Sequence, residues 1–168
     1  ALSADESYVC VAETAARTVV RWWLRGPKAG TRDYLVRDLP GYPDNISRGS
    51  DGLIWVTVAS PTDALVSRLQ RAPMFLRKAA TKVPLALQPN PKRTVRVQAF
   101  EDEGRLVGIL TNRDLRFVVD VEQPVSNLMT SDGLVTAPAG TTLDEASQIL
   151  HRRKVEKLPV VDENGYLT

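Results

Sequence analysis

The first half of the chain alternates between apolar and polar residues, as half-buried β-strands do. Within residues 18–25, Val20 and Trp22 fall on one predicted face and Arg21 falls on the other. Further strands are predicted at residues 8–12, 33–39 and 53–59, and the last is apolar enough to be covered on both faces. Strands at this spacing, separated by polar turns, predict antiparallel β-structure: a sandwich, a barrel or a propeller blade.

The second half contains an internal repeat. Residues 97–106 recur as residues 158–167, and Gly104 is equivalent to Gly165. Each copy is an apolar run, an acidic turn closed by glycine and the start of a second apolar run. This order predicts two β-hairpins and a repeated supersecondary unit.

A helix is predicted between the two copies, over residues 142–153. Thr142 and Glu145 have the spacing of a capping box, and the basic residues at the other end, including His151, suit the negative end of the helix dipole. Leu134-Val-Thr136 upstream predicts a short strand, and residues 138–140 predict a turn. His151 is the only histidine, and no nucleophile or carboxylate is placed beside it by sequence, so we expect no catalytic role for it.

Gly108-Ile-Leu-Thr-Asn-Arg-Asp114 predicts a strand that runs into a helix with Thr111 at its N-cap. Two interpretations remain open. Thr111 and Asp114 could form an ordinary cap. Alternatively, the helix start could favour a phosphate while the carboxylate binds a ribose.

Residues 103–168 resemble the paired cystathionine-β-synthase-type (CBS) domains of inosine monophosphate dehydrogenase. The resemblance rests on several motifs in the family's order: Gly108-Ile-Leu-Thr-Asn-Arg-Asp114, Gln123-Pro-Val-Ser-Asn-Leu-Met-Thr130, Leu134-Val-Thr-Ala-Pro-Ala-Gly-Thr-Thr-Leu-Asp-Glu-Ala146 and Lys154-Val-Glu-Lys-Leu-Pro-Val-Val-Asp162.

This resemblance implies a regulatory module for a purine nucleotide, ATP or GTP. The matching motif places Thr111 and Asp114 on the ribose and phosphate, with Asn112 and Arg113 between them. The family's catalytic barrel has no counterpart, so no dehydrogenase activity is implied. A complete CBS pair also needs a helix near residues 81–92, where Pro84, Pro89 and Pro91 oppose one, and a further element beyond residue 168. We therefore expect a partial module.

The other candidate site is Pro43-Asp-Asn-Ile46. Asp44 and Asn45 offer hard oxygen ligands suited to Ca²⁺, and Glu13 at the end of a predicted strand could join them. The alternative is a turn held by Asx hydrogen bonds, with Glu13 solvated.

Residues 1–97 resemble strictosidine synthase-like six-bladed β-propellers of the adipocyte plasma membrane-associated type. This resemblance implies that Asp44 and Asn45 face a central channel and bind Ca²⁺ with ligands from other blades. A blade takes roughly 40 to 45 residues, so about two blades are present. Their open strand edges predict self-association. The resemblance is carried by these stretches: Val11-Ala-Glu-Thr14, Val20-Arg-Trp-Trp-Leu-Arg-Gly-Pro-Lys-Ala-Gly30, Leu39-Pro-Gly-Tyr-Pro-Asp-Asn-Ile46 and Asp51-Gly-Leu-Ile-Trp-Val56.

A basic, helical stretch at residues 61–84 could lie on an anionic membrane or pack on its own domain. Its match to an insertion in the propeller family favours packing, so we expect no membrane contact. The net charge of +2 gives no reason to expect nucleic-acid binding. Cys10 is the single cysteine, in an apolar strand, and is predicted to be a buried hydrophobe without a disulfide. The sequence shows no signal peptide or transmembrane run, which favours the cytoplasm for the CBS-type half.

The predicted fold class is thus mixed: a partial antiparallel propeller over residues 1–97, then a partial α/β CBS-type module over residues 98–168. Three functions remain. The chain could be a purine-nucleotide regulatory module, a fragment of a Ca²⁺-dependent lactonase-type hydrolase, or a composite without a complete site. Because both resemblances are partial, we expect no catalysis by this chain alone, and nucleotide binding as the function that survives.

Overall fold

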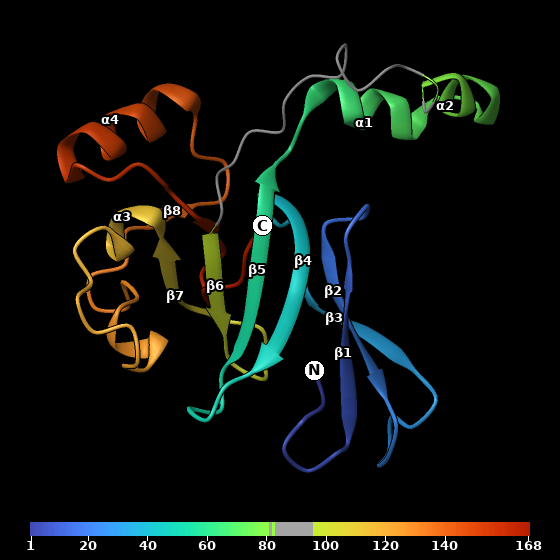
Figure 1. Cartoon of the computed structure of the whole chain (residues 1–168), viewed down its shortest axis with the longest axis horizontal. Coiled ribbons are helices and arrows are strands. Elements are labelled where there is room, and N and C mark those ends of the chain that lie inside the picture. Colours follow the sequence, from blue (N-terminus) through green and yellow to red (C-terminus); the bar gives the residue numbers. More distant parts are fainter. Residues whose placement is uncertain (81, 83–95) are drawn as a thin grey trace.

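A computed structural model describes residues 1–80, 82 and 96–168. Its strands form an antiparallel three-stranded sheet, β1-β2-β3, an antiparallel four-stranded sheet, β4-β5-β6-β7, and a parallel pair, β8-β9 (Figure 1). The strands are β1 (Tyr8–Glu13), β2 (Thr18–Trp23), β3 (Arg32–Val36), β4 (Gly41–Arg48), β5 (Ile54–Pro61), β6 (Arg96–Phe100), β7 (Leu106–Thr111), β8 (Ala137–Pro138) and β9 (Val160–Val161). The helices are α1 (Ala64–Arg71), α2 (Met74–Ala80), α3 (Asn112–Leu115) and α4 (Leu143–Arg153), with a 3-10 turn at Val125–Asn127.

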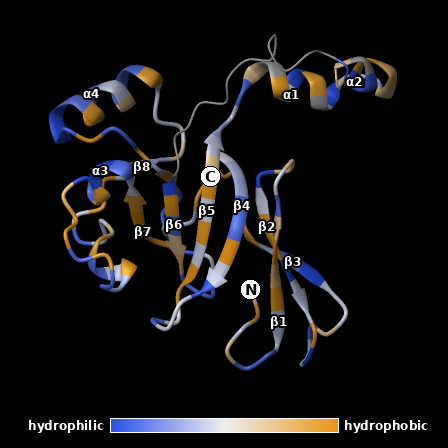
Figure 2. Cartoon of the chain, viewed as in Figure 1, coloured by the Kyte–Doolittle hydropathy of each residue, from blue (hydrophilic) through white to orange (hydrophobic). Residues whose placement is uncertain are grey.

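The predicted strands of the first half are confirmed, with altered ends and faces. β2 ends at Trp23, and an irregular register between Val19 and Val20 buries both residues, so its alternation is imperfect. In β5, Ile54, Val56 and Val58 are completely buried, whereas the opposite face is only half-buried. Hydrophobic residues recur along β1, β5 and β7 in Figure 2.

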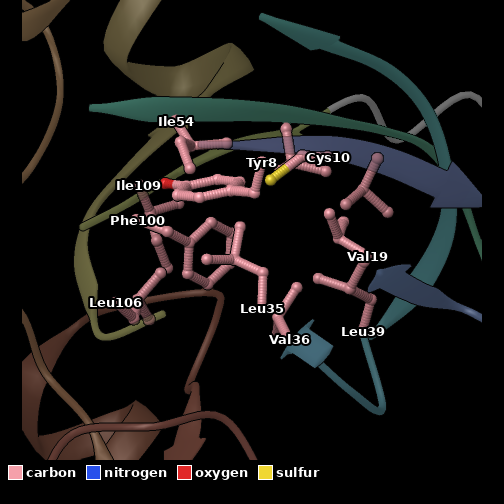
Figure 3. Packing of buried hydrophobic residues seen from close by; sticks show 12 residues of the cluster. Tyr8, Cys10, Val19, Leu35, Val36, Leu39, Ile54, Phe100, Leu106 and Ile109 are labelled. Atoms are coloured by element: carbon pink, nitrogen blue, oxygen red, sulfur yellow. The ribbon is translucent and has the colours of Figure 1, made fainter. Parts of the chain in front are cut away.

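One hydrophobic core lies between the two larger sheets. Tyr8 reaches it from β1, Val19 from β2 and Leu39 from the loop after β3, and Phe100 and Ile109 reach it from β6 and β7 (Figure 3). Cys10, 2% exposed, belongs to the same cluster, as expected for a cysteine that acts as a small hydrophobe. The core therefore draws on residues from both sides of the expected domain boundary.

The expected boundary between residues 97 and 98 falls inside β6. This strand pairs with β5 on one side and with β7 on the other. The four-stranded sheet is thus an antiparallel meander, the unit from which propeller blades are built. No closed barrel or ring of blades occurs among the described residues, and the propeller assignment for residues 1–97 stays a prediction.

The two copies of the repeat form equivalent turns. In the first, Glu101 N donates to Arg105 O at 3.1 Å and Gly104 N donates to Glu101 O at 2.9 Å. In the second, Asp162 N donates to Tyr166 O at 2.8 Å and Gly165 N donates to Asp162 O at 3.1 Å. Both glycines have positive φ, 98° and 86°, which glycine adopts without steric cost. The repeat predicted from the sequence is therefore present in the backbone, and Leu106 N donates to Gly165 O across the copies.

Helix α4 begins as predicted. Thr142 N and Oγ1 both donate to Glu145 Oε2 at 2.8 Å, and Glu145 N donates to Thr142 Oγ1 at 3.3 Å. The prediction of a strand at residues 134–136 is wrong, because the paired segment is β8, whose Ala137 lies opposite Val160. Leu134 instead packs against the hydrophobic core.

The basic segment forms helices α1 and α2, which extend from the end of β5 away from the sheets (Figure 1). Residues 81 and 83–95 lie outside the described residues, and so do Pro84, Pro89 and Pro91, which were expected to prevent a CBS-type helix. In the described part of the chain, no helix combines the length and the apolar character needed to cross a membrane.

Candidate functional site

The structure confirms the predicted cap at the end of β7. Thr111 N and Thr111 Oγ1 both donate to Asp114 Oδ2, each at 2.7 Å. The helix that follows, α3, has only four residues. These two bonds fix the Asp114 carboxylate beside the strand end and engage one of its two oxygens.

Thr111, Arg113 and Asp114 line a cavity of about 70 Å³. The other walls come from two segments distant in sequence, residues 130–135 and 155–157. Backbone bonds hold the first segment in place: Ile109 N donates to Thr130 O at 3.1 Å and Thr130 N donates to Ile109 O at 2.9 Å. The second segment is tied to the cap because Arg113 Nη1 donates to Lys154 O at 3.2 Å.

The structure thus brings together three of the four predicted nucleotide residues, and Asn112 does not line the cavity. Lys157 and the loop at residues 133–135 were not predicted from the sequence as nucleotide-binding residues. Leu134, Val135 and Lys157 lie within motifs that carry the CBS resemblance, which was the available signal. Only the tertiary fold places them against Asp114.

A larger groove of about 460 Å³ shares Gly133, Leu134 and Val135 with this cavity. Arg152 and Arg153, in the last turn of α4, line its other side. The smaller cavity alone is below the roughly 300 to 1,000 Å³ of typical ligand sites, whereas the groove falls within that range. Together they run from a carboxylate that accepts hydrogen bonds to two guanidinium groups that suit an anion.

The predicted calcium residues lie on two different strands. Asp44 and Asn45 are exposed on β4, at an irregular register between Pro43 and Ile46, and Asn45 Nδ2 donates to Asp44 Oδ2 at 3.3 Å. Glu13, at the end of β1, accepts from Thr18 Oγ1 at 3.0 Å and pairs with Arg32 at 3.9 Å.

Among the described residues, no three His, Cys, Asp or Glu side chains gather as a metal site would require. Ca²⁺ takes six to eight oxygen ligands in the general case. Asp44 and Asn45 therefore do not fit the ion on their own, and a calcium site stays a prediction.

Comparison with known proteins finds similarity in the second half of the chain. Residues 125–168 match the family described as CBS domain. Inosine-5'-monophosphate dehydrogenase of Halalkalibacterium halodurans is 55% identical over 71 residues, which cover 42% of this chain and 15% of that protein. The Staphylococcus epidermidis enzyme is 58% identical over 67 residues, covering 40% and 14%, and the Aquifex aeolicus enzyme is 48% identical over 91 residues, covering 52% and 19%.

These matches confirm the predicted resemblance of the second half to the CBS region of inosine monophosphate dehydrogenase. The chain spans less than a fifth of the length of these relatives. The resemblance of residues 1–97 to strictosidine synthase-like propellers stays a prediction.

Proposed function

We propose that residues 98–168 act as a CBS-type regulatory module that binds a purine nucleotide. The observation that carries this proposal is the meeting of Thr111 and Asp114 with segments 130–135 and 155–157 in one cavity. The match of residues 125–168 to the CBS domain family supports the same conclusion. The proposal concerns regulation, and it assigns no dehydrogenase chemistry to this chain.

The arrangement of donors and acceptors suggests how the nucleotide lies. Within the described part of the chain, the hydrogen bonds to Asp114 end on Oδ2, which leaves Oδ1 to accept from a ribose hydroxyl. Residues 133–135 would contact the base, and Arg152 and Arg153 would face the phosphates. The small cavity has to widen into the adjoining groove, so we expect the loop at residues 133–135 to move on binding.

The test is calorimetry and thermal unfolding of the chain with ATP and with GTP. We expect a rise in Tm with nucleotide concentration, because a ligand that binds only the folded state stabilises it. Asp114→Asn should remove this rise, since the amide is neutral and would present an N–H to the ribose or to Thr111. Thr111→Ala should weaken binding by freeing the carboxylate to rotate.

Glu145→Gln provides the matched control. Glu145 accepts the same pair of bonds from Thr142 at the start of α4 but does not line the cavity that contains Asp114. This variant should keep the nucleotide response while paying a similar capping cost. A flat nucleotide titration of the wild type, together with a Ca²⁺-dependent shift that Asp44→Ala abolishes, would instead favour the propeller-type metal site.

A further inference from the structure

A second cavity, of about 230 Å³, lies beside the first and is built largely from different residues. Arg96 and Gln98 of β6 line it, together with Asp38 and the segment at residues 156–160. It shares Ile109, Glu156 and Lys157 with the cavity that contains Asp114. Arg96 and Gln98 lie outside the residues that match the CBS domain family.

Gln98 is the most informative residue of this cavity. It is 1% exposed, and its Oε1 has no hydrogen-bond partner among the described residues. Its neighbours across the sheet are Val56 and Ile109, which offer no side-chain donor. A buried acceptor without a donor is unfavourable, and an apolar residue at this position would avoid that cost. The glutamine therefore indicates that a donor enters from the cavity.

Arg96 lies two residues away on the same face of β6. It is half-buried, and its Nε also lacks a partner within the described part of the chain. Burial lowers the pKa of this guanidinium, as expected for a cation held away from water and from a counter-ion. Lys157 supplies a second cation to the same cavity.

The carboxylates of the cavity limit the ligand further. Asp38 pairs with Arg17 at 3.6 Å, and Glu156, which also lines the cavity, is exposed. Carboxylates accept hydrogen bonds, so a purely anionic ligand would meet repulsion from them, whereas hydroxyl groups would donate to them. The ligand should therefore carry an anion at one end and hydroxyl donors at the other.

We propose that this cavity binds a small phosphorylated polyol. Its phosphate contacts Arg96 and Lys157, and its hydroxyls donate to Gln98 Oε1 and to Glu156. The volume is several times the roughly 30 Å³ of one water molecule and lies below that of drug-sized sites, so a ligand of a few carbon atoms fits.

The test is isothermal titration calorimetry of the chain with glycerol 3-phosphate as the probe. We expect binding at one site, no binding of glycerol, which lacks the anion, and weaker binding of sulfate, which lacks a hydroxyl donor at neutral pH. Gln98→Met keeps the side-chain length but removes the acceptor, and it should weaken binding by at least about tenfold. Sulfate that binds as tightly as the probe would overturn the polyol assignment.

Lys157→Met guards against a folding defect in the Gln98 variant, because Lys157 is only half-buried. Lys157→Met should also weaken the binding of glycerol 3-phosphate. Arg71→Met, which removes a cation from α1, should leave this binding unchanged. Asp114→Asn should still bind glycerol 3-phosphate, so this proposal and the nucleotide proposal fail separately. No heat from the wild type, or full affinity in both Gln98→Met and Lys157→Met, would overturn the proposal.

Discussion

The phenol of Tyr8 donates a 2.5 Å hydrogen bond to the carboxylate of Asp102 and so joins β1 to the turn between β6 and β7. Arg48 of β4 donates to the same carboxylate and, at 3.0 Å, to the Tyr8 oxygen. Arg21 Nη1 donates to the Asp102 carbonyl at 2.5 Å. Burial, and then the bond to Asp102, raise the pKa of Tyr8. One acidic turn thus ties three strands, β1, β2 and β4, to the β6–β7 hairpin.

Replacing Asp102 with alanine should lower the free energy of unfolding by about 1 to 2 kcal/mol, because Tyr8 and Arg48 would lose a charged acceptor. The expected loss of stability is modest because the Asp102 side chain is 47% exposed, so water can accept part of the hydrogen bonding from Tyr8 and Arg48 in its place. Urea denaturation measures the change. Asp132→Ala, which removes an exposed carboxylate, is the control and should stay near the wild type. Equal stabilities of the two variants would show that the network contributes nothing.

The contribution of Asp102 should depend on pH. Burial works to raise its pKa, but the hydrogen bonds from Arg48 and Tyr8 outweigh burial and hold the pKa below the ordinary value of 3.8. Above about pH 4 the carboxylate is ionised in the folded and the unfolded chain, and its full contribution is present. As the pH falls further, Asp102 is protonated in the unfolded chain before it is protonated in the folded chain. Its contribution to the free energy of unfolding therefore decreases as the pH drops from the unfolded-state pKa to the lower folded-state pKa.

The stability difference between the wild type and Asp102→Ala should therefore shrink below about pH 4. Urea titrations over a series of acidic pH values test this. In an Arg48→Met background the same comparison should show a weaker pH dependence, because the hydrogen bond from Arg48, which does most to lower the pKa of Asp102, is gone. A difference that stays constant down to the most acid condition would contradict the assignment.

Gly104→Ala should be more damaging than Gly133→Ala. Both glycines have positive φ, 98° and 71°, so alanine costs roughly 1 to 2 kcal/mol at either position. A Cβ at Gly104 would also collide with the carbonyl oxygen of Leu35, whereas a Cβ at Gly133 meets open space. We expect a total of about 2 to 5 kcal/mol for Gly104→Ala, measured by denaturation. Similar losses of stability in the two variants would show that the Leu35 carbonyl leaves room for a Cβ at position 104.

Local features of the fold could be predicted from the sequence. The caps at Thr111 and Thr142 follow from residues three positions apart, and the two equivalent turns follow from their acidic residues and glycines. Alternation located the first strands, but it did not show which sheets they would form. Pairing of β5 with β6 joins segments separated by residues 62–95, and no local pattern encodes that contact.

The same limit applies to the candidate sites. Thr111 and Asp114 were predictable because they interact within one turn. The loop at residues 133–135 and Lys157 reach them only through the tertiary fold. Gln98 looked like an ordinary strand residue, and its missing partner becomes visible only when Val56 and Ile109 are known to flank it.

Strand β6 also determines how the chain can come apart. It is hydrogen-bonded along both edges, and Phe100, at its end, is completely buried in the common core. Unfolding of residues 1–97 or of residues 98–168 alone would therefore remove hydrogen-bond and core partners from the other part, so we expect one cooperative unfolding transition in place of two. The expected boundary between residues 97 and 98 consequently marks no weak point for proteases, and β6 should be among the last parts of the backbone to exchange its amide protons.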